Sequence, residues 1–250
     1  MIRYSRAPRS PRVQYQYHAQ TNQSQHQNPP PPRQPLGSGS STLVVGSIVG
    51  ICVGLFGYTA LQETEYRANG SKKAAQWLRT VRDQFTLSIR NVREGRYYVL
   101  LTHTLAHTDL THLGFNMLAL WGFGRMIVAW YGLPTFATIW VGSAVVGGIA
   151  QMGYWMKYPH PGIEMQAVGC SGAVFGMLSA LSFVNPHMRI LLLIVPMSLR
   201  TSMLLSVVFS LYCINTEQLQ RYGHVDHLGG MAFGAFWWLV ALRRGRIGRL

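Results

Sequence analysis

The chain has 250 residues, of which 48% are hydrophobic and 12% are charged, and its formal net charge is +14 at pH 7. The apolar residues are gathered into long uncharged runs separated by short polar segments, which is typical of a membrane protein. The basic residues lie in the termini and loops and form no amphipathic face with interleaved aromatic residues. The charge therefore indicates membrane topology and argues against a nucleic-acid partner.

Residues 1–42 contain five arginines, a proline-rich run and no acidic residue. Such a segment cannot form a core, so we expect it to be disordered. Its spaced arginines are typical of a mitochondrial transit peptide or of an ordinary basic tail. The carboxy-terminal tail, residues 243–250, holds four arginines. With six spans between them, both basic ends lie on the same side of the membrane.

Six stretches approach the roughly 20 apolar residues that a helix needs to cross a hydrocarbon core about 30 Å thick. Together they predict an all-α membrane domain over residues 43–242. The stretches are 43–61, about 111–131, 133–155, 165–184, 201–214 and about 226–242. Pro196 argues against one continuous helix through the apolar segment before the fifth span and that span itself.

The connection between the first two spans, residues 62–110, is too long for a simple loop. Its apolar part, YYVLLTHTLAH at 97–107, is too short to cross a bilayer. We therefore expect a long, membrane-associated first loop. His103 and His107 lie in it four residues apart, and we interpret His107 as a residue that fixes loop geometry.

Three of the predicted spans, the second, the fourth and the sixth, contain polar residues of catalytic type, and polar groups inside a membrane usually face the bundle interior. His112 and Asn116 are four residues apart, so both project from one helical face. The alternative is that this pair only joins neighbouring helices by hydrogen bonds. Ser171 lies in VGCSGAVFG, which does not match the G-x-S-x-G elbow of the α/β hydrolases. For Ser171 the alternative is an incidental serine in a glycine packing face.

His227 in the sixth span shares a helical stripe with Gly230 and Gly234. If this stripe packs against the glycines that follow Ser171, the imidazole reaches the hydroxyl as a base reaches its nucleophile. The oxyanion would then need donors, and His112, Asn116 and the Ser171 backbone N–H are the candidates.

Asp226 directly precedes His227, but neighbouring residues on a helix point about 100° apart. We therefore expect a Ser171–His227 dyad and no triad.

The stretches HTDLTHLGFNM, GCSG and HLGGMAFG, in this order, resemble the motifs of the rhomboid intramembrane serine proteases. The resemblance covers about residues 43–242 and implies a six-helix core that cleaves transmembrane segments of other proteins within the lipid bilayer. It also implies that Ser171 is the nucleophile and His227 the general base, that His112 and Asn116 stabilise the oxyanion, and that no metal or other cofactor is needed.

The chain departs from the family pattern at two positions. Gly95 stands where a tryptophan is common in the first-loop motif, and Asp226 stands where many members have alanine. The arginine-rich terminus and the long first loop look most like the mitochondrial inner-membrane group, and a secretory-pathway rhomboid is the alternative. The alternative function is a catalytically inactive rhomboid-like protein that binds or escorts transmembrane clients.

The three cysteines, Cys52, Cys170 and Cys213, all fall in apolar runs and have no metal-ligand spacing. We interpret them as small buried side chains and expect no disulfide framework.

Overall fold

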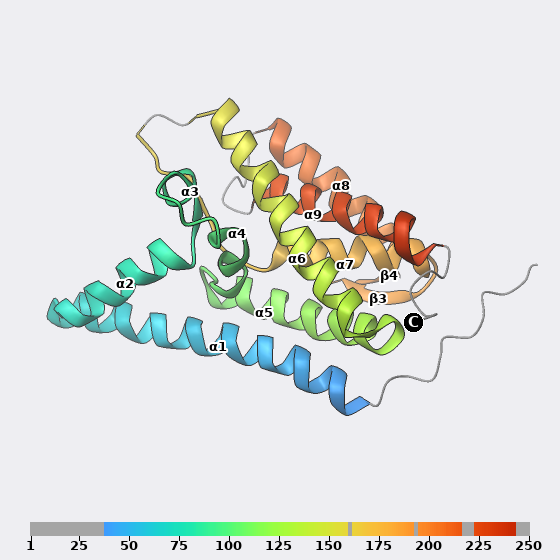
Figure 1. Ribbon diagram of the computed structural model, residues 1–250, viewed down its shortest axis with the longest axis horizontal. Coiled ribbons are helices and arrows are strands. Elements are labelled where there is room, and N and C mark those ends of the chain that lie inside the picture. Colours follow the sequence, from blue (N-terminus) through green and yellow to red (C-terminus); the bar gives the residue numbers. More distant parts are fainter. Residues whose placement is uncertain (1–37, 160–161, 193–194, 217–222, 244–250) are drawn as a thin grey trace, which may run out of the picture. The chain divides into compact units, whose positions relative to one another are not determined.

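The computed structural model describes residues 38–159, 162–192, 195–216 and 223–243, which are mostly helical (Figure 1). The basic amino-terminal segment up to residue 37 and the tail from residue 244 lie outside the described residues. Helix α1 (Ser38–Asn69) begins before the predicted boundary at residue 43 and continues beyond residue 61. Its last turns are polar but contain good helix formers, so the helix outlasts the apolar pattern that located it.

Among the described residues, three helical segments are long and apolar enough to cross a membrane: Ser41–Asn69, Leu110–Lys157 and His224–Leu242. Two shorter apolar helices accompany them, α7 (Ser171–Val184) and α8 (Leu199–Asn215). The helical class predicted from the sequence is thus confirmed, with two short antiparallel strand pairs added to it.

The second long segment contains α5 (Leu110–Ala119), the π-helical turn η2 (Leu120–Gly124) and α6 (Arg125–Lys157). It breaks at Gly132, where φ is 84° and ψ is 168°. Glycine adopts a positive φ without strain, and the following Pro134 has no backbone N–H to continue the helix. The break falls between the two spans predicted at 111–131 and 133–155.

The first loop folds into short helices that pack beside the bundle. It contains α2 (Lys72–Gln84), α3 (Ile89–Arg93), α4 (Val99–Thr102) and the 3-10 turn η1 (His103–Leu105). Strand β1 (Leu87–Ser88) pairs antiparallel with β2 (Gln166–Ala167), just before α7. The first loop is thereby tied to the segment that leads to Ser171.

Asn91 holds this loop together from a buried position. Its amide Nδ2 donates to the backbone carbonyls of Arg82 and Thr86, at 2.9 and 2.8 Å, and its Oδ1 accepts from Arg96 at 3.0 Å. Gly95 has a φ of +82°, so the turn after α3 favours glycine over any residue with a side chain.

Strands β3 (Arg189–Leu192) and β4 (Val195–Ser198) form an antiparallel hairpin that leads into α8. The extended apolar stretch before the fifth span is therefore a separate element from the helix, as Pro196 predicted. The last predicted span corresponds to α9 (His224–Trp237) and the π-helical turn η4 (Trp238–Leu242).

Helices α6, α7 and α9 pack against one another and form the centre of the bundle (Figure 1). The main apolar core contains Ile139 of α6, Met177 and Leu181 of α7 and Leu120 of η2, all at most 1% exposed. This three-helix contact is the one that positions the candidate site.

Candidate active site

Ser171 and His227 are in direct contact, because the Ser171 Oγ lies 2.7 Å from Nε2 of His227. Ser171 is the first residue of α7, and His227 lies in the first turn of α9. His227 is buried, with 8% of its surface exposed. The two polar side chains thus meet where two helices begin.

The position of Ser171 at a helix start corrects the span predicted at 165–184. Gly169 has a φ of +119°, and its N–H donates to the carbonyl of His103 at 2.8 Å, so the chain cannot be helical there. Helix α7 begins only at Ser171, after its N-cap residue Cys170. The first N–H groups of a helix have no acceptor within it. The Ser171 hydroxyl therefore lies next to backbone N–H groups of α7 that can donate to a ligand.

Glycines allow the backbones of α7 and α9 to approach each other closely enough for Ser171 and His227 to meet. A Cβ added at Gly230 would lie 2.1 Å from the carbonyl oxygen of Gly172, and one added at Gly234 would lie 2.0 Å from that of Gly176. Both distances are far below van der Waals contact, so only glycine fits at these two positions of α9. The helix contact expected from the glycine stripe is present in the structure.

The His227 ring is oriented by an aromatic neighbour on α7. The ring of Phe175 lies 4.5 Å from it between centroids, tilted by 40°, and the His224 ring lies 5.8 Å away. Phe175 follows Ser171 by one helical turn, so the helix that carries the hydroxyl also packs against the imidazole. Phe175 could not be predicted from the sequence, because a phenylalanine in an apolar span gives no sign of a site.

Asp226 points away from His227, toward α6 and α7. A Cβ added at Gly147 would lie 2.4 Å from its Oδ1, and one added at Gly172 would lie 2.4 Å from its Oδ2. No hydrogen bond or ion pair joins Asp226 to His227, both of which the structure describes. The Asp226 carboxyl therefore lies away from the imidazole, in line with the 100° offset between neighbouring helix residues.

His112 and Asn116 lie against the segment just before Ser171 and make no direct hydrogen bond to the Ser171 side chain. The His112 ring packs on Gly169, where an added Cβ would be 2.6 Å from its Cε1. Asn116 donates to the carbonyl of His112 at 2.8 Å, and its Oδ1 accepts from the Cys170 thiol at 3.6 Å. The side chain of Asn116 is therefore partly engaged by its own helix.

The start of α5 is fixed by Asp109, whose carboxylate accepts from the backbone N–H of His112 at 2.8 Å. This bond and the Thr108 hydroxyl hold the pKa of Asp109 below its usual range. The ring of His107 lies 5.2 Å from that of His112, and its Nε2 is 3.7 Å from the Cys170 sulfur. His107 thus connects the first loop to Cys170, the residue before Ser171, which agrees with a role in loop geometry.

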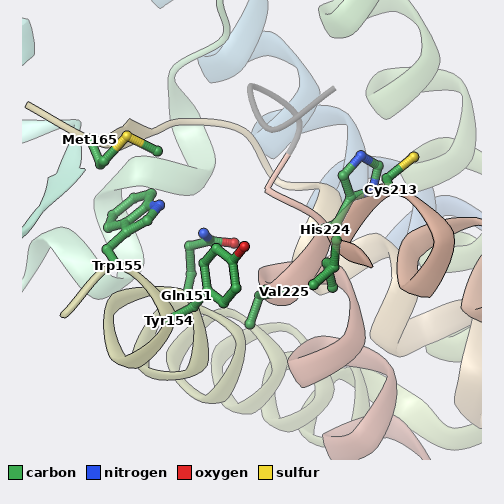
Figure 2. A pocket seen from close by; sticks show the side chains of 8 residues that line it. Gln151, Tyr154, Trp155, Met165, Cys213, His224 and Val225 are labelled. Atoms are coloured by element: carbon green, nitrogen blue, oxygen red, sulfur yellow. The ribbon is translucent and has the colours of Figure 1, made fainter. Parts of the chain in front are cut away.

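A small pocket lies between α6, α8 and α9 and includes His224, which precedes His227 on α9 (Figure 2). Its lining is mainly aromatic and apolar, with the polar groups of Gln151 and His224 in it. The lining residues are Gln151, Tyr154, Trp155, Met165, Cys213, Ile214, His224 and Val225. Within the described parts of the chain, no group of three histidine, cysteine, aspartate or glutamate side chains is arranged to bind a metal ion.

Fold and site together define a helical membrane protein that carries a hydrogen-bonded serine and histidine at the starts of two glycine-packed helices. The chain belongs to the rhomboid family, because the Rhomboid domain pattern matches residues 94–244, more than half of its length.

Individual relatives come from mitochondria and bacteria. The chain is 32% identical over 148 residues to Rhomboid protein 1, mitochondrial, of Saccharomyces cerevisiae. This alignment covers 57% of this chain and 41% of the yeast protein. It is 30% identical over 145 residues to Rhomboid protease GluP of Bacillus subtilis, covering 58% and 26%. It is 25% identical over 142 residues to human Presenilin-associated rhomboid-like protein, mitochondrial, covering 55% and 36%.

These alignments span less than half the length of each relative. The mitochondrial relatives and the apolar helices identify a mitochondrial integral membrane protein of the rhomboid family, as predicted.

Proposed function

We propose that the protein is an intramembrane serine protease that hydrolyses peptide bonds in or near transmembrane segments of other proteins. The observation that carries the proposal is the 2.7 Å contact between the Ser171 Oγ and the His227 Nε2 at the start of α7. We further propose six spans. They are α1, the two parts of Leu110–Lys157 on either side of Gly132, α7, α8 and α9. We also propose a location in the mitochondrial inner membrane.

In the first step the Ser171 oxygen attacks the carbonyl carbon of the scissile bond, and His227 Nε2 takes the hydroxyl proton. This requires the imidazole tautomer with its hydrogen on Nδ1. The imidazolium then gives its proton to the leaving amine, which departs and leaves an acyl ester on Ser171. Water attacks this ester, His227 again removes the proton, and Ser171 regains its hydrogen as the acid product leaves.

The negative oxygen of each tetrahedral intermediate needs hydrogen-bond donors in place beforehand. The Ser171 N–H belongs to the first turn of α7, whose N–H groups have no acceptor within the helix. We assign His112 and Asn116 as the side-chain donors, because both lie against Gly169 and Cys170, directly before the nucleophile. Loss of one such donor typically slows a hydrolase by about 10²- to 10³-fold.

The relatives support this function at the level of the family, since GluP is named a rhomboid protease. A rhomboid-like protein without activity, which binds or escorts transmembrane clients, is the competing function. It would not require a hydroxyl and an imidazole at hydrogen-bonding distance.

The test is cleavage of a co-reconstituted single-span substrate by the purified full-length chain in liposomes. We expect Ser171→Ala to abolish cleavage, and a fluorophosphonate to label a peptide that contains position 171. The matched control is Ser143→Ala, which removes a fully buried hydroxyl from α6 with no assigned hydrogen-bond partner. Cleavage that persists in Ser171→Ala would overturn the nucleophile. A wild-type protein that neither cleaves nor is labelled would favour the binding function.

A further inference from the structure

Asp226 is a buried carboxyl group for which the proposed chemistry has no use. The residue is 5% exposed and lies between α6 and α7, in a slot that exists because Gly147 and Gly172 have no side chain. Its Oδ1 has no hydrogen-bond partner. Burying a carboxyl group with an unsatisfied oxygen costs free energy, so other contacts of the group have to offset this cost.

The first turn of α7 provides one contact. The first intrahelical bond of α7 runs from the Val174 N–H to the Cys170 carbonyl at 2.9 Å, so the N–H groups of residues 171–173 have no acceptor within the helix. The Asp226 carboxyl lies against this turn, with its Oδ2 2.4 Å from the place that a Cβ at Gly172 would occupy. A carboxyl group from α9 thus faces the turn of α7 whose N–H groups lack an intrahelical acceptor, at the residue that follows the nucleophile.

The first turn of α9 is held from α6 by a hydrogen bond. The first intrahelical bond there joins the His227 N–H to the Gly223 carbonyl at 3.0 Å. The preceding N–H, that of Asp226, donates to Oε1 of Gln151 at 3.0 Å. Figure 2 shows the Gln151 side chain reaching from α6 toward the start of α9. Gln151 is itself 3% exposed, so this bond is shielded from competing water.

We propose that Gln151, Asp226 and Gly172 form a polar strap across α6, α9 and α7, in which the Asp226 carboxyl accepts from the Gly172 N–H, and that Asp226 is a positioning residue for the Ser171–His227 pair. The strap rests on the proposed function, because its purpose is to fix the two helix starts that carry the nucleophile and its base. It also occupies the Gly172 N–H from the side of α9, which leaves the N–H of Ser171 as the backbone donor for the oxyanion.

The inference has a kinetic consequence that a general loss of stability does not have. An Asp226→Ala variant frees the first turn of α7, so the hydroxyl moves relative to the imidazole while the lipid-facing surface is unchanged. A misplacement of about 1 Å can slow a reaction by about 10²-fold, so we expect kcat to fall about 10- to 100-fold with KM unchanged. Asp226→Asn keeps an oxygen that can accept from Gly172 and should restore most of the rate.

The closing experiment has one arm that needs no catalysis. Hydrogen exchange of the Gly172 amide is measured in the full-length Ser171→Ala protein, with and without Asp226→Ala, in the same liposomes. We expect exchange to quicken about tenfold or more when the carboxyl is removed, since the amide loses its acceptor. This arm stands even if the wild-type protein proves inactive, so the failure of the strap and the failure of the proposed function are distinguishable.

The second arm compares kcat and KM of the wild-type protein with those of the Asp226→Ala and Asp226→Asn variants. Should Asp226→Ala fail to fold, Gln151→Met takes its place, because it removes the acceptor of the Asp226 N–H and keeps the side-chain length. Unchanged exchange at Gly172, or a rise in KM that matches the loss of kcat with no rescue by asparagine, would overturn the proposal.

Discussion

The contact between α7 and α9 leads to a prediction that the structure makes quantitative. In a Gly234→Ala variant the new Cβ lies 2.0 Å from the Gly176 carbonyl oxygen, which is 1.4 Å short of the 3.4 Å at which ordinary contact begins. The obstacle is backbone, so no side-chain rotation relieves it. The helices must separate, and overpacking of this kind costs about 1–3 kcal/mol.

The same separation reaches the site, because Gly234 follows His227 by seven residues on one helical face. The Ser171 Oγ and the His227 Nε2 now lie 2.7 Å apart, and a further ångström takes them beyond hydrogen-bonding distance. We expect the rate of fluorophosphonate labelling to fall by about 10²-fold and the melting temperature to decrease.

The assay is labelling of the purified protein in detergent, with thermal unfolding measured on the same preparation. The matched control is Gly153→Ala in α6, where an added Cβ meets nothing within 4 Å. The control should label at the wild-type rate. A Gly234→Ala protein with wild-type labelling and melting would refute the reasoning, because it would mean that the two helices are not held at glycine contact.

Three further results are expected. Gly172→Ala should destabilise the protein, since its Cβ lies 2.4 Å from Oδ2 of Asp226. Adding Asp226→Ala should recover part of the loss in a double-mutant cycle of melting temperatures, and strict additivity would contradict this placement. Gly169→Ala should slow fluorophosphonate labelling, because the φ of +119° at this position strains every residue with a side chain. Labelling at the wild-type rate would contradict this. Burial lowers the pKa of His103 to about 4, so the folded protein keeps it neutral while the unfolded chain protonates it below about pH 6.5. The stability it contributes is complete above that pH and is lost as the pH falls toward 4; a melting curve with no steeper acid decline than that of His103→Gln would exclude this.

Much of the helix arrangement could be predicted from the sequence, because apolar length and glycine spacing depend only on local pattern. The break at Gly132 lies between the spans predicted at about 111–131 and 133–155, and glycines at helical spacing indicated the close approach of α7 and α9. The Ser171 to His227 contact followed from these glycines once they were assumed to face each other.

Helix ends could not be predicted in the same way. The hydropathy of residues 165–184 is uniform, so it predicts one helix. The chain there is extended at β2, turns at Gly169 and becomes helical only at Ser171. The pairing of β2 with β1 decides this, and that contact joins residues far apart in sequence. Tertiary hydrogen bonds thus outweighed the local apolar pattern.

The direction of Asp226 shows the same limit more sharply. From the sequence it is only a neighbour of His227 whose side chain points elsewhere, and nothing local says what it meets. In the structure its carboxyl enters the slot left by two glycines on different helices, and its backbone N–H is held by Gln151. Because glycine contacts bring the three helices so close, a polar group at this depth finds its partners only on the neighbouring helices. The geometry of the candidate site therefore depends on residues that touch neither the hydroxyl nor the imidazole, and substitutions at Asp226 or Gln151 should alter rate before they alter substrate binding.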